Sequence, residues 1–123
     1  MLHKMLKVLI VEDEIFVGLL LEETLQSLGY QVCAIASTEA DAVLQAEKYQ
    51  PDFMIVDAGL SVGSGISAIE EIQKKRNIPH IFVTGDPRKV RSRLPDAIIL
   101  EKPFFIPQLI EAIARTLAIS NAP

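Results

Sequence analysis

Short apolar runs alternate with longer amphipathic stretches along the chain. The apolar runs are rich in β-branched residues and have the length of strands that are buried on both faces of a sheet. Five strands are predicted in this way, over residues 7–11, 31–36, 53–57, 81–84 and 97–100. The third run, Phe53-Met54-Ile55-Val56-Asp57, ends on an acid and is followed by several glycines, so the chain should turn sharply there.

The stretches between the strands carry apolar residues at helical spacing. The first predicted helix, over 15–28, has its apolar face on Val17, Leu21, Leu25 and Leu28. Further helices are predicted over 38–49, over 66–75 and from Pro107 onwards, the last with a buried face of Ile110, Ile113 and Leu117. Because Pro87 and Pro95 flank the segment before the fifth strand, the helix between them should be short or irregular.

Strands that alternate with helices indicate a parallel sheet with helices on both faces. Right-handed crossovers restrict the winding, and we predict a doubly wound, flavodoxin-like (CheY-like) α/β sheet of strand order 2-1-3-4-5. The whole chain, residues 1–123, is the length of one domain. In this order the first and third strands are neighbours, so the acids that follow them should share one crevice.

Polar residues follow the strands at this carboxyl edge. They are Glu12, Asp13, Asp57, Thr84 and Lys102. Each has an ordinary structural explanation, such as a turn cap, a helix N-terminus or a solvated charge, and taken alone each explanation is about as good as a functional one. Five residues that reach the same edge independently are much harder to explain in that way.

The chemistry of these side chains favours a phosphorylation site. Three clustered carboxylates repel one another and need a cation, and hard oxygen ligands suit Mg²⁺. Lys102 supplies a point charge for a phosphoryl group, and a threonine hydroxyl or glycine amide can donate to its oxygens. Metal and lysine together would offset the charge that develops when a carboxylate is phosphorylated.

Composition narrows the function classes. Half of the residues are hydrophobic, which is enough for a full core without disulfides, and the single Cys33 fits a reducing cytoplasm as a buried, inert thiol. A net charge of −4 argues against direct nucleic-acid binding. No run approaches the length of a membrane span, and the N-terminus lacks the features of a signal peptide.

The residues at the strand ends, taken as a set, resemble those of the receiver domain of bacterial two-component response regulators. The resemblance covers nearly the whole chain and depends on Glu12-Asp13, Asp57, Gly65, Thr84 and Lys102-Pro103-Phe104. It implies that Asp57 accepts a phosphoryl group. It also implies that Asp13, Asp57 and the backbone carbonyl of Gly59 bind Mg²⁺, for which Mn²⁺ can substitute, while Glu12 acts largely through bound water.

The resemblance also implies roles around the phosphoryl group. Thr84 would hydrogen-bond to it, Lys102 would contact it, and the backbone amides of Ala58 and Gly85 would donate to its oxygens. Receivers commonly hold the peptide bond between this lysine and the proline that follows it in cis, so Lys102-Pro103 is expected to be cis.

A signalling role follows from the resemblance. The chain would receive its phosphoryl group from a histidine kinase or a histidine phosphotransfer protein and would then change its binding to a downstream protein. It would catalyse only its own phosphorylation and dephosphorylation, so it would not be an enzyme in the ordinary sense. Two copies could pair through the face formed by the fourth helix, the fifth strand and the last helix.

Other readings remain open. The chain could be a pseudo-receiver that binds partners without phosphorylation, or a fragment of a longer regulator with an output domain. A phosphatase of the haloacid dehalogenase type would need a second acid at Gly59. A flavodoxin-like cofactor protein would need a phosphate-cradling loop after the first strand, where Glu12-Asp13-Glu14 would repel a phosphate.

Three features depart from the usual receiver pattern. Ile99 stands where most receivers have an aromatic residue on the fifth strand, and Ser61 replaces a frequent proline. The segment from Thr84 to Lys102 is short. With these departures, the run Ile81-Phe82-Val83-Thr84-Gly85 is similar to the receiver subclass called FATGUY, although Val83 and Asp86 differ from its motif.

Basic residues gather in two segments. They are Lys74, Lys75, Arg76, Arg88, Lys89, Arg91 and Arg93. A solvated face is the default interpretation, and a docking surface for an acidic partner is the alternative. His3 and His80 have no metal-ligand spacing and are given no role.

Overall fold

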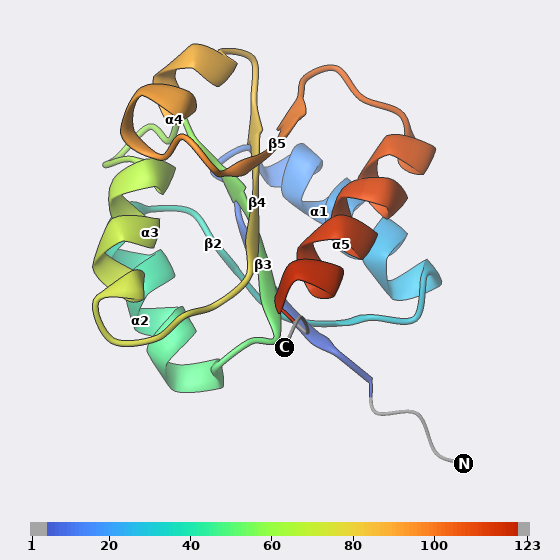
Figure 1. Ribbon diagram of the computed structural model, residues 1–123. Coiled ribbons are helices and arrows are strands. Elements are labelled where there is room, and N and C mark those ends of the chain that lie inside the picture. Colours follow the sequence, from blue (N-terminus) through green and yellow to red (C-terminus); the bar gives the residue numbers. More distant parts are fainter. Residues whose placement is uncertain (1–4, 121–123) are drawn as a thin grey trace.

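The computed structural model describes residues 5–120 and shows a single parallel sheet flanked by helices (Figure 1). The strands are β1 (Lys7–Val11), β2 (Gln31–Ala36), β3 (Phe53–Asp57), β4 (His80–Thr84) and β5 (Ile98–Glu101). Their order is β2-β1-β3-β4-β5, and every neighbouring pair is parallel. The predicted strand order and fold class are therefore confirmed. His3 lies outside the described residues.

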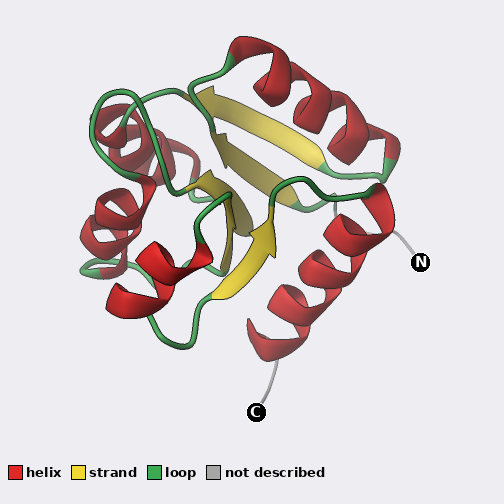
Figure 2. Cartoon of the chain, turned by 90° about the horizontal axis from the view of Figure 1, so that it is seen from above, coloured by secondary structure: helices red, strands yellow, loops and turns green. Residues whose placement is uncertain are grey.

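Helices cover both faces of the sheet, as Figures 1 and 2 show. They are α1 (Ile15–Ser27), α2 (Glu39–Tyr49), α3 (Gly65–Gln73), α4 (Pro87–Arg93) and α5 (Ile106–Ser120). Helices α1 and α5 pack on one face, where Leu25 and Ile113 join a core with Phe53 and Ile55. Helices α2, α3 and α4 pack on the other face around Met54 and Phe82. No helix within residues 5–120 combines the length and apolar character needed to cross a membrane.

The central strand β3 is buried along its whole length. It lies between β1 and β4, so alternate side chains enter opposite cores, which explains why its sequence is apolar without alternation. Val56 lies beside Val11, and Asp57 lies beside Val83. The register brings the ends of β1, β3 and β4 to the same level, which places the residues that follow these strands around one crevice.

Local sequence explains where the helices begin and end. The Thr38 side chain accepts a hydrogen bond from the Asp41 amide at 3.1 Å, as a helix N-cap does. The Ser64 hydroxyl caps α3 by accepting from the Ile66 and Ser67 amides, at 3.1 and 3.3 Å. Gly29 follows α1 with a φ of +94°, the left-handed conformation expected of it. The Lys102-Pro103 peptide bond is cis, as expected.

Two predicted apolar faces needed correction. Leu28 is exposed at the end of α1, and Ile110 on α5 is 46% exposed. The side of α5 that faces the sheet is instead made by Leu109, Ala112, Ile113 and Thr116. Thr116 can be buried because its hydroxyl donates to the Ala112 carbonyl at 2.8 Å. Of the predicted residues on α5, Ile113 is buried and Leu117 packs against the core, so the prediction was wrong only at Ile110. The spacing of apolar residues also could not reveal that the polar Thr116 takes a core position.

Cys33 is half-buried, and its thiol donates a weak hydrogen bond to the Val8 carbonyl at 3.4 Å. Burial raises the pKa of the thiol above its usual value, so the reactive thiolate is disfavoured. This agrees with the prediction of an unreactive cysteine, although the side chain is less buried than the apolar sequence around it suggested.

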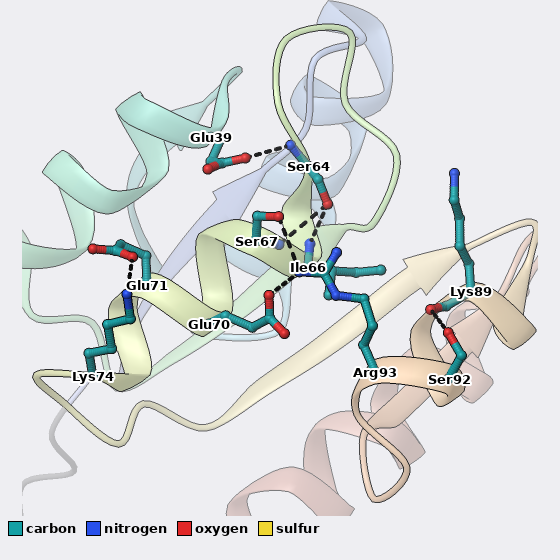
Figure 3. A network of polar contacts seen from close by, with 10 residues as sticks. All are labelled: Glu39, Ser64, Ile66, Ser67, Glu70, Glu71, Lys74, Lys89, Ser92 and Arg93. Atoms are coloured by element: carbon teal, nitrogen blue, oxygen red, sulfur yellow. Dashed lines mark hydrogen bonds and ion pairs between the residues drawn. The ribbon is translucent and has the colours of Figure 1, made fainter.

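Helix α4 is short, as the flanking prolines predicted. It has seven residues, and only Val90 is buried. Arg93 at its end donates to Glu70 and, at 3.4 Å, to the Ser67 hydroxyl, both on α3 (Figure 3). Among the seven basic residues singled out from the sequence, the ion-paired ones are Lys74, Lys75, Arg88 and Arg93. Acidic neighbours therefore neutralise a large part of this basic surface.

Candidate functional site

Three carboxylates meet at the carboxyl edge of the sheet. Glu12, Asp13 and Asp57 each offer one oxygen, and these oxygens lie within 4.8 Å of one another. Glu12 and Asp13 directly follow β1, and Asp57 is the last residue of β3. The adjacent strands β1 and β3 thus bring together acids that are far apart in the sequence. This cluster can hold a cation, and its hard oxygen ligands suit a small divalent ion.

Lys102 joins the cluster from the loop after β5. Its Nζ donates to Asp57 Oδ2 at 3.1 Å and lies 3.8 Å from Glu12 Oε1. Partial burial works against the charged amine, yet the hydrogen bond with Asp57 and the charges of the acids outweigh it and raise the pKa of Lys102. The lysine is therefore held as a cation beside Asp57.

Glu12 is the most buried acid of the site, and its charged form is disfavoured. It is 3% exposed, and burial followed by its contact with Asp57 raises the pKa of the carboxyl group from 4.5 to about 7. The Glu14 amide, which donates to Glu12 Oε2 at 3.2 Å, opposes this effect only in part. Burial, more than repulsion between the acids, therefore disfavours the charged form of Glu12.

This raised pKa predicts how stability changes with pH in the metal-free protein. Because the folded state holds the Glu12 proton more tightly, its stabilising contribution is complete below pH 4.5 and is lost as pH rises through about 7. The loss should be on the order of 3 kcal/mol. We expect Glu12→Gln to remove this loss and to be more stable than the wild type above neutral pH, as measured by urea unfolding in EDTA.

The exposed neighbour Glu14 offers a control for this experiment. Glu14→Gln should leave the decline of unfolding free energy with pH in place. A wild type whose unfolding free energy stays constant through neutral pH, or a Glu12→Gln variant that keeps the full decline, would contradict the assignment of this loss to Glu12.

The pKa of Asp13 is shifted in the opposite direction. Its Oδ2 accepts hydrogen bonds from the Ser61 amide at 2.7 Å and from the Ser61 hydroxyl. These bonds, the hydroxyl above all, lower the pKa of Asp13. From the sequence, Ser61 was noted only because it replaces a frequent proline. Its link to Asp13 could not be read from spacing, because it depends on how the loop after β3 folds back.

Two backbone amides that follow Asp57 have different partners in the structure. The Ala58 amide donates to the Val83 carbonyl at 3.2 Å and so continues the ladder between β3 and β4. The Gly59 amide donates to Asp57 Oδ1 at 2.9 Å. The Ala58 amide therefore has a partner in the sheet, whereas the Gly59 amide is directed at the carboxylate. The assignment of the Ala58 amide to a phosphoryl group stays a prediction.

Thr84 and Gly85 stand on the other side of Asp57. Thr84 is buried, and its hydroxyl accepts a hydrogen bond from the Asp86 amide at 3.0 Å. Gly85 has open space where a side chain would begin. Together with Lys102 these residues line an open cleft of about 510 Å³ that also contains Asp13 and Asp57. All the residues singled out at the strand ends lie at this edge of the sheet.

Lys89 is a residue of the cleft to which sequence reasoning gave no role in the site. It lies on α4, is exposed, and lines the cleft beside Asp86. In the sequence it was one of several basic residues, and nothing distinguished it from Arg88 or Arg91. Only the direction of the short helix brings it to the cleft.

Comparisons with known proteins agree with this geometry. Residues 8–114 match the family model described as "Response regulator receiver domain". The chain is 38% identical over 119 residues to the transcriptional regulatory protein PdtaR of Mycobacterium tuberculosis, covering 94% of this chain. It is 29% identical to the chemotaxis protein CheY of Bacillus subtilis, covering 90% of this chain and 97% of CheY.

A solved structure with a similar fold is the receiver domain of the response regulator PhyR from Erythrobacter litoralis. It has a TM-score of 0.87 and 30% sequence identity, and the match covers 97% of this chain and 95% of that one. The chain spans 57% of the length of PdtaR, so that relative is considerably longer than the segment it shares with this chain.

Proposed function

This chain belongs to the response regulator receiver family, and on that premise we propose that it accepts a phosphoryl group on Asp57 and then changes its affinity for a protein partner. One observation carries the proposal. The Asp57 carboxylate ends the central strand, opens into the cleft, and lies 3.1 Å from the Lys102 ammonium beside two further acids. A carboxylate with this surrounding can act as a nucleophile toward phosphorus.

In the proposed reaction an Asp57 oxygen attacks the phosphorus of a phosphohistidine on a histidine kinase or phosphotransfer protein. An O–P bond forms as the P–N bond breaks, and the electron pair leaves with the donor imidazole, which takes up a proton. Lys102 stays close to the developing negative charge. The Gly59 amide, the Thr84 hydroxyl and the Gly85 amide stand nearby as donors for the phosphoryl oxygens.

The three acids fit Mg²⁺ because their oxygens are hard ligands that lie close together. Lys102 neutralises only part of their negative charge. Asp13, Asp57 and the Gly59 carbonyl would hold the ion, and Glu12 would act through bound water. When bound, Mg²⁺ would supply positive charge for the transferring phosphoryl group, and Mn²⁺ could replace it.

No external substrate is turned over in this proposal, so the chain acts as a switch rather than an enzyme. The complete set of acids favours phosphorylation over a pseudo-receiver role. The single free cysteine supports a cytoplasmic location. Pairing of two copies through α4, β5 and α5 is compatible with the exposed Ile106 and Ile110 of α5.

The proposal is tested by incubating the protein with a small acyl phosphate and following its intact mass. We expect one phosphoryl group to be added in Mg²⁺ and none in EDTA, and the product should be stable in acid but labile in base. Absence of labelling in Mg²⁺, with a known receiver labelled in parallel, would overturn the proposal.

We expect phosphorylation to order residues 85–96. Few apolar contacts hold α4, and its tether through Arg93 joins half-exposed side chains, which contributes little to stability (Figure 3). A Thr84 hydroxyl that turned toward a phosphoryl group would change its contact with the Asp86 amide, at the start of α4. Ile99 has no ring to reorient, so this segment is the natural alternative readout.

Hydrogen exchange with and without beryllofluoride checks this expectation. Amides in 85–96 should exchange faster than those of α3 and α5 in the free protein and become protected when beryllofluoride and Mg²⁺ are added. Thr84→Val should bind the mimic yet show much less of this protection. Equal and strong protection of 85–96 in both states would point to rigid-body switching instead.

A further inference from the structure

One serine in the loop after β3 is joined to an acid of the cation cluster. The Ser61 amide donates to Asp13 Oδ2 at 2.7 Å, and the Ser61 hydroxyl donates to the same oxygen. Ser61 is exposed, and Asp13 is half-exposed. Two donors on one oxygen of a partly solvated carboxylate are more than a surface aspartate needs, because water could satisfy that oxygen equally well.

We propose that Ser61 is a positioning residue for the divalent cation. By holding Asp13 Oδ2, it fixes the plane of the carboxylate and leaves Oδ1 to bind the ion. Carboxylates that bind metals are commonly held in this way by hydrogen bonds to the oxygen that faces away from the metal. The inference rests on the proposed function, since it concerns the affinity of that site for its ion.

The effect depends on Ser61 lying on a fixed loop, and the far side of this loop is anchored to α2. The Ser64 amide donates to Glu39 Oε1 at 2.9 Å, as Figure 3 shows, and the Glu39 amide donates to the Val62 carbonyl at 3.2 Å. Two residues that follow Ser61 are therefore held, which limits the movement of its donors independently of Asp13.

The same loop begins with Gly59, whose carbonyl is a proposed ligand. The Gly59 amide is held by Asp57 Oδ1, and Gly59 also pairs with Ser64 across the loop. Ser61 thus connects the ligand that follows β1 to the loop that carries the ligand following β3. Loss of its hydrogen bonds would free the Asp13 side chain and relax the spacing of two ligands at once.

The test is a calorimetric titration of the protein with Mg²⁺. Ser61→Ala removes the hydroxyl donor, and we expect the affinity for Mg²⁺ to fall by about 10-fold, as is typical when a ligand loses such support. Ser61→Thr keeps both donors and should restore affinity to within about threefold of the wild type. Ser61→Pro removes both donors and should bind Mg²⁺ no more tightly than Ser61→Ala.

Ser64→Ala is the matched control, because this serine lies in the same loop but touches no acid of the cluster. Its hydroxyl caps α3, so its loss should lower the melting temperature while leaving the affinity for Mg²⁺ nearly unchanged. A simple loosening of the loop would weaken Mg²⁺ binding in Ser64→Ala as much as in Ser61→Ala, and that result would overturn the inference.

The remaining outcomes separate the two proposals. If the wild type binds no Mg²⁺, the metal part of the proposed function fails and the inference fails with it. If the wild type binds Mg²⁺ and Ser61→Ala binds it equally well, only the inference fails. Tighter binding by Ser61→Ala would show that Ser61 competes with the ion for Asp13, which also overturns the positioning role.

Discussion

Asp57→Asn is expected to abolish phosphorylation completely. The asparagine amide has nearly the shape of the carboxylate but lacks the anionic oxygen that attacks phosphorus. Incubation with an acyl phosphate and Mg²⁺, followed by intact-mass measurement, should show no addition to the variant under conditions that label the wild type.

The variant should remain folded, so the loss can be read as chemical. Removing the Asp57 charge takes away repulsion from Glu12, whose pKa Asp57 helps to raise. Lys102 loses one partner but keeps Glu12 within 3.8 Å. Unfolding in urea should therefore show stability close to that of the wild type, with the same cooperative transition.

Asp52→Asn supplies a matched control at the other end of the same strand. Asp52 directly precedes β3, and its Oδ2 accepts a hydrogen bond from the Lys7 amide at 2.7 Å, at the edge of the sheet opposite the cleft. This change should cost about 1 kcal/mol of stability and leave labelling intact. Undiminished labelling of Asp57→Asn would move the phosphoacceptor to another acid, and Asp13 would be the next to test.

The sequence was sufficient to predict the fold and the set of residues at the sheet edge. Apolar runs such as Phe53–Val56 are long enough to identify buried strands, and the alternation with helices leaves few parallel topologies. Because all parallel strands end at one edge, residues that follow different strands must come close together. The family match confirmed the resemblance, and the structure confirmed the strand order.

Details that depend on backbone direction could not be predicted in the same way. Which amide faces Asp57 is decided by the turn at Ala58 and Gly59, where one amide stays in the sheet ladder and the next leaves it. The contact between Ser61 and Asp13 arises only when this loop folds back over β1. Likewise, Thr116 entered the core because a local hydrogen bond satisfied its hydroxyl, which no apolar pattern reveals.

The structure also changed the electrostatic picture of the site. From the sequence, the three acids were expected to repel one another. In the fold, Glu12 is buried and has a raised pKa, whereas Asp13 reaches the donors of Ser61 and has a lowered one. Removal of Glu12 rather than Asp13 is therefore the change that should stabilise the metal-free protein.

Gly65→Ala should strongly destabilise the protein. A Cβ at this position would lie 2.0 Å from the Asp57 carbonyl oxygen and 2.8 Å from Val56 Cγ1. The Gly65 amide is also bonded to the Ala58 carbonyl at 3.1 Å, so the first turn of α3 is held directly against the end of β3. Because the obstructing atoms include backbone, either α3 or Asp57 must move.

We expect Gly65→Ala to lower the free energy of unfolding by about 3 kcal/mol or more, measured by urea unfolding. Alanine favours a helix over glycine by about 1 kcal/mol, and this gain offsets part of the steric cost. The steric cost is therefore larger than the measured loss of unfolding free energy. The displaced Asp57 should also be labelled more slowly by an acyl phosphate in whatever protein remains folded. Gly85→Ala, at the same edge but with no atom within 4 Å of its Cβ, should change stability by no more than about 0.5 kcal/mol. If the two variants were equally stable, the close approach of α3 to β3 would not constrain the position of Asp57.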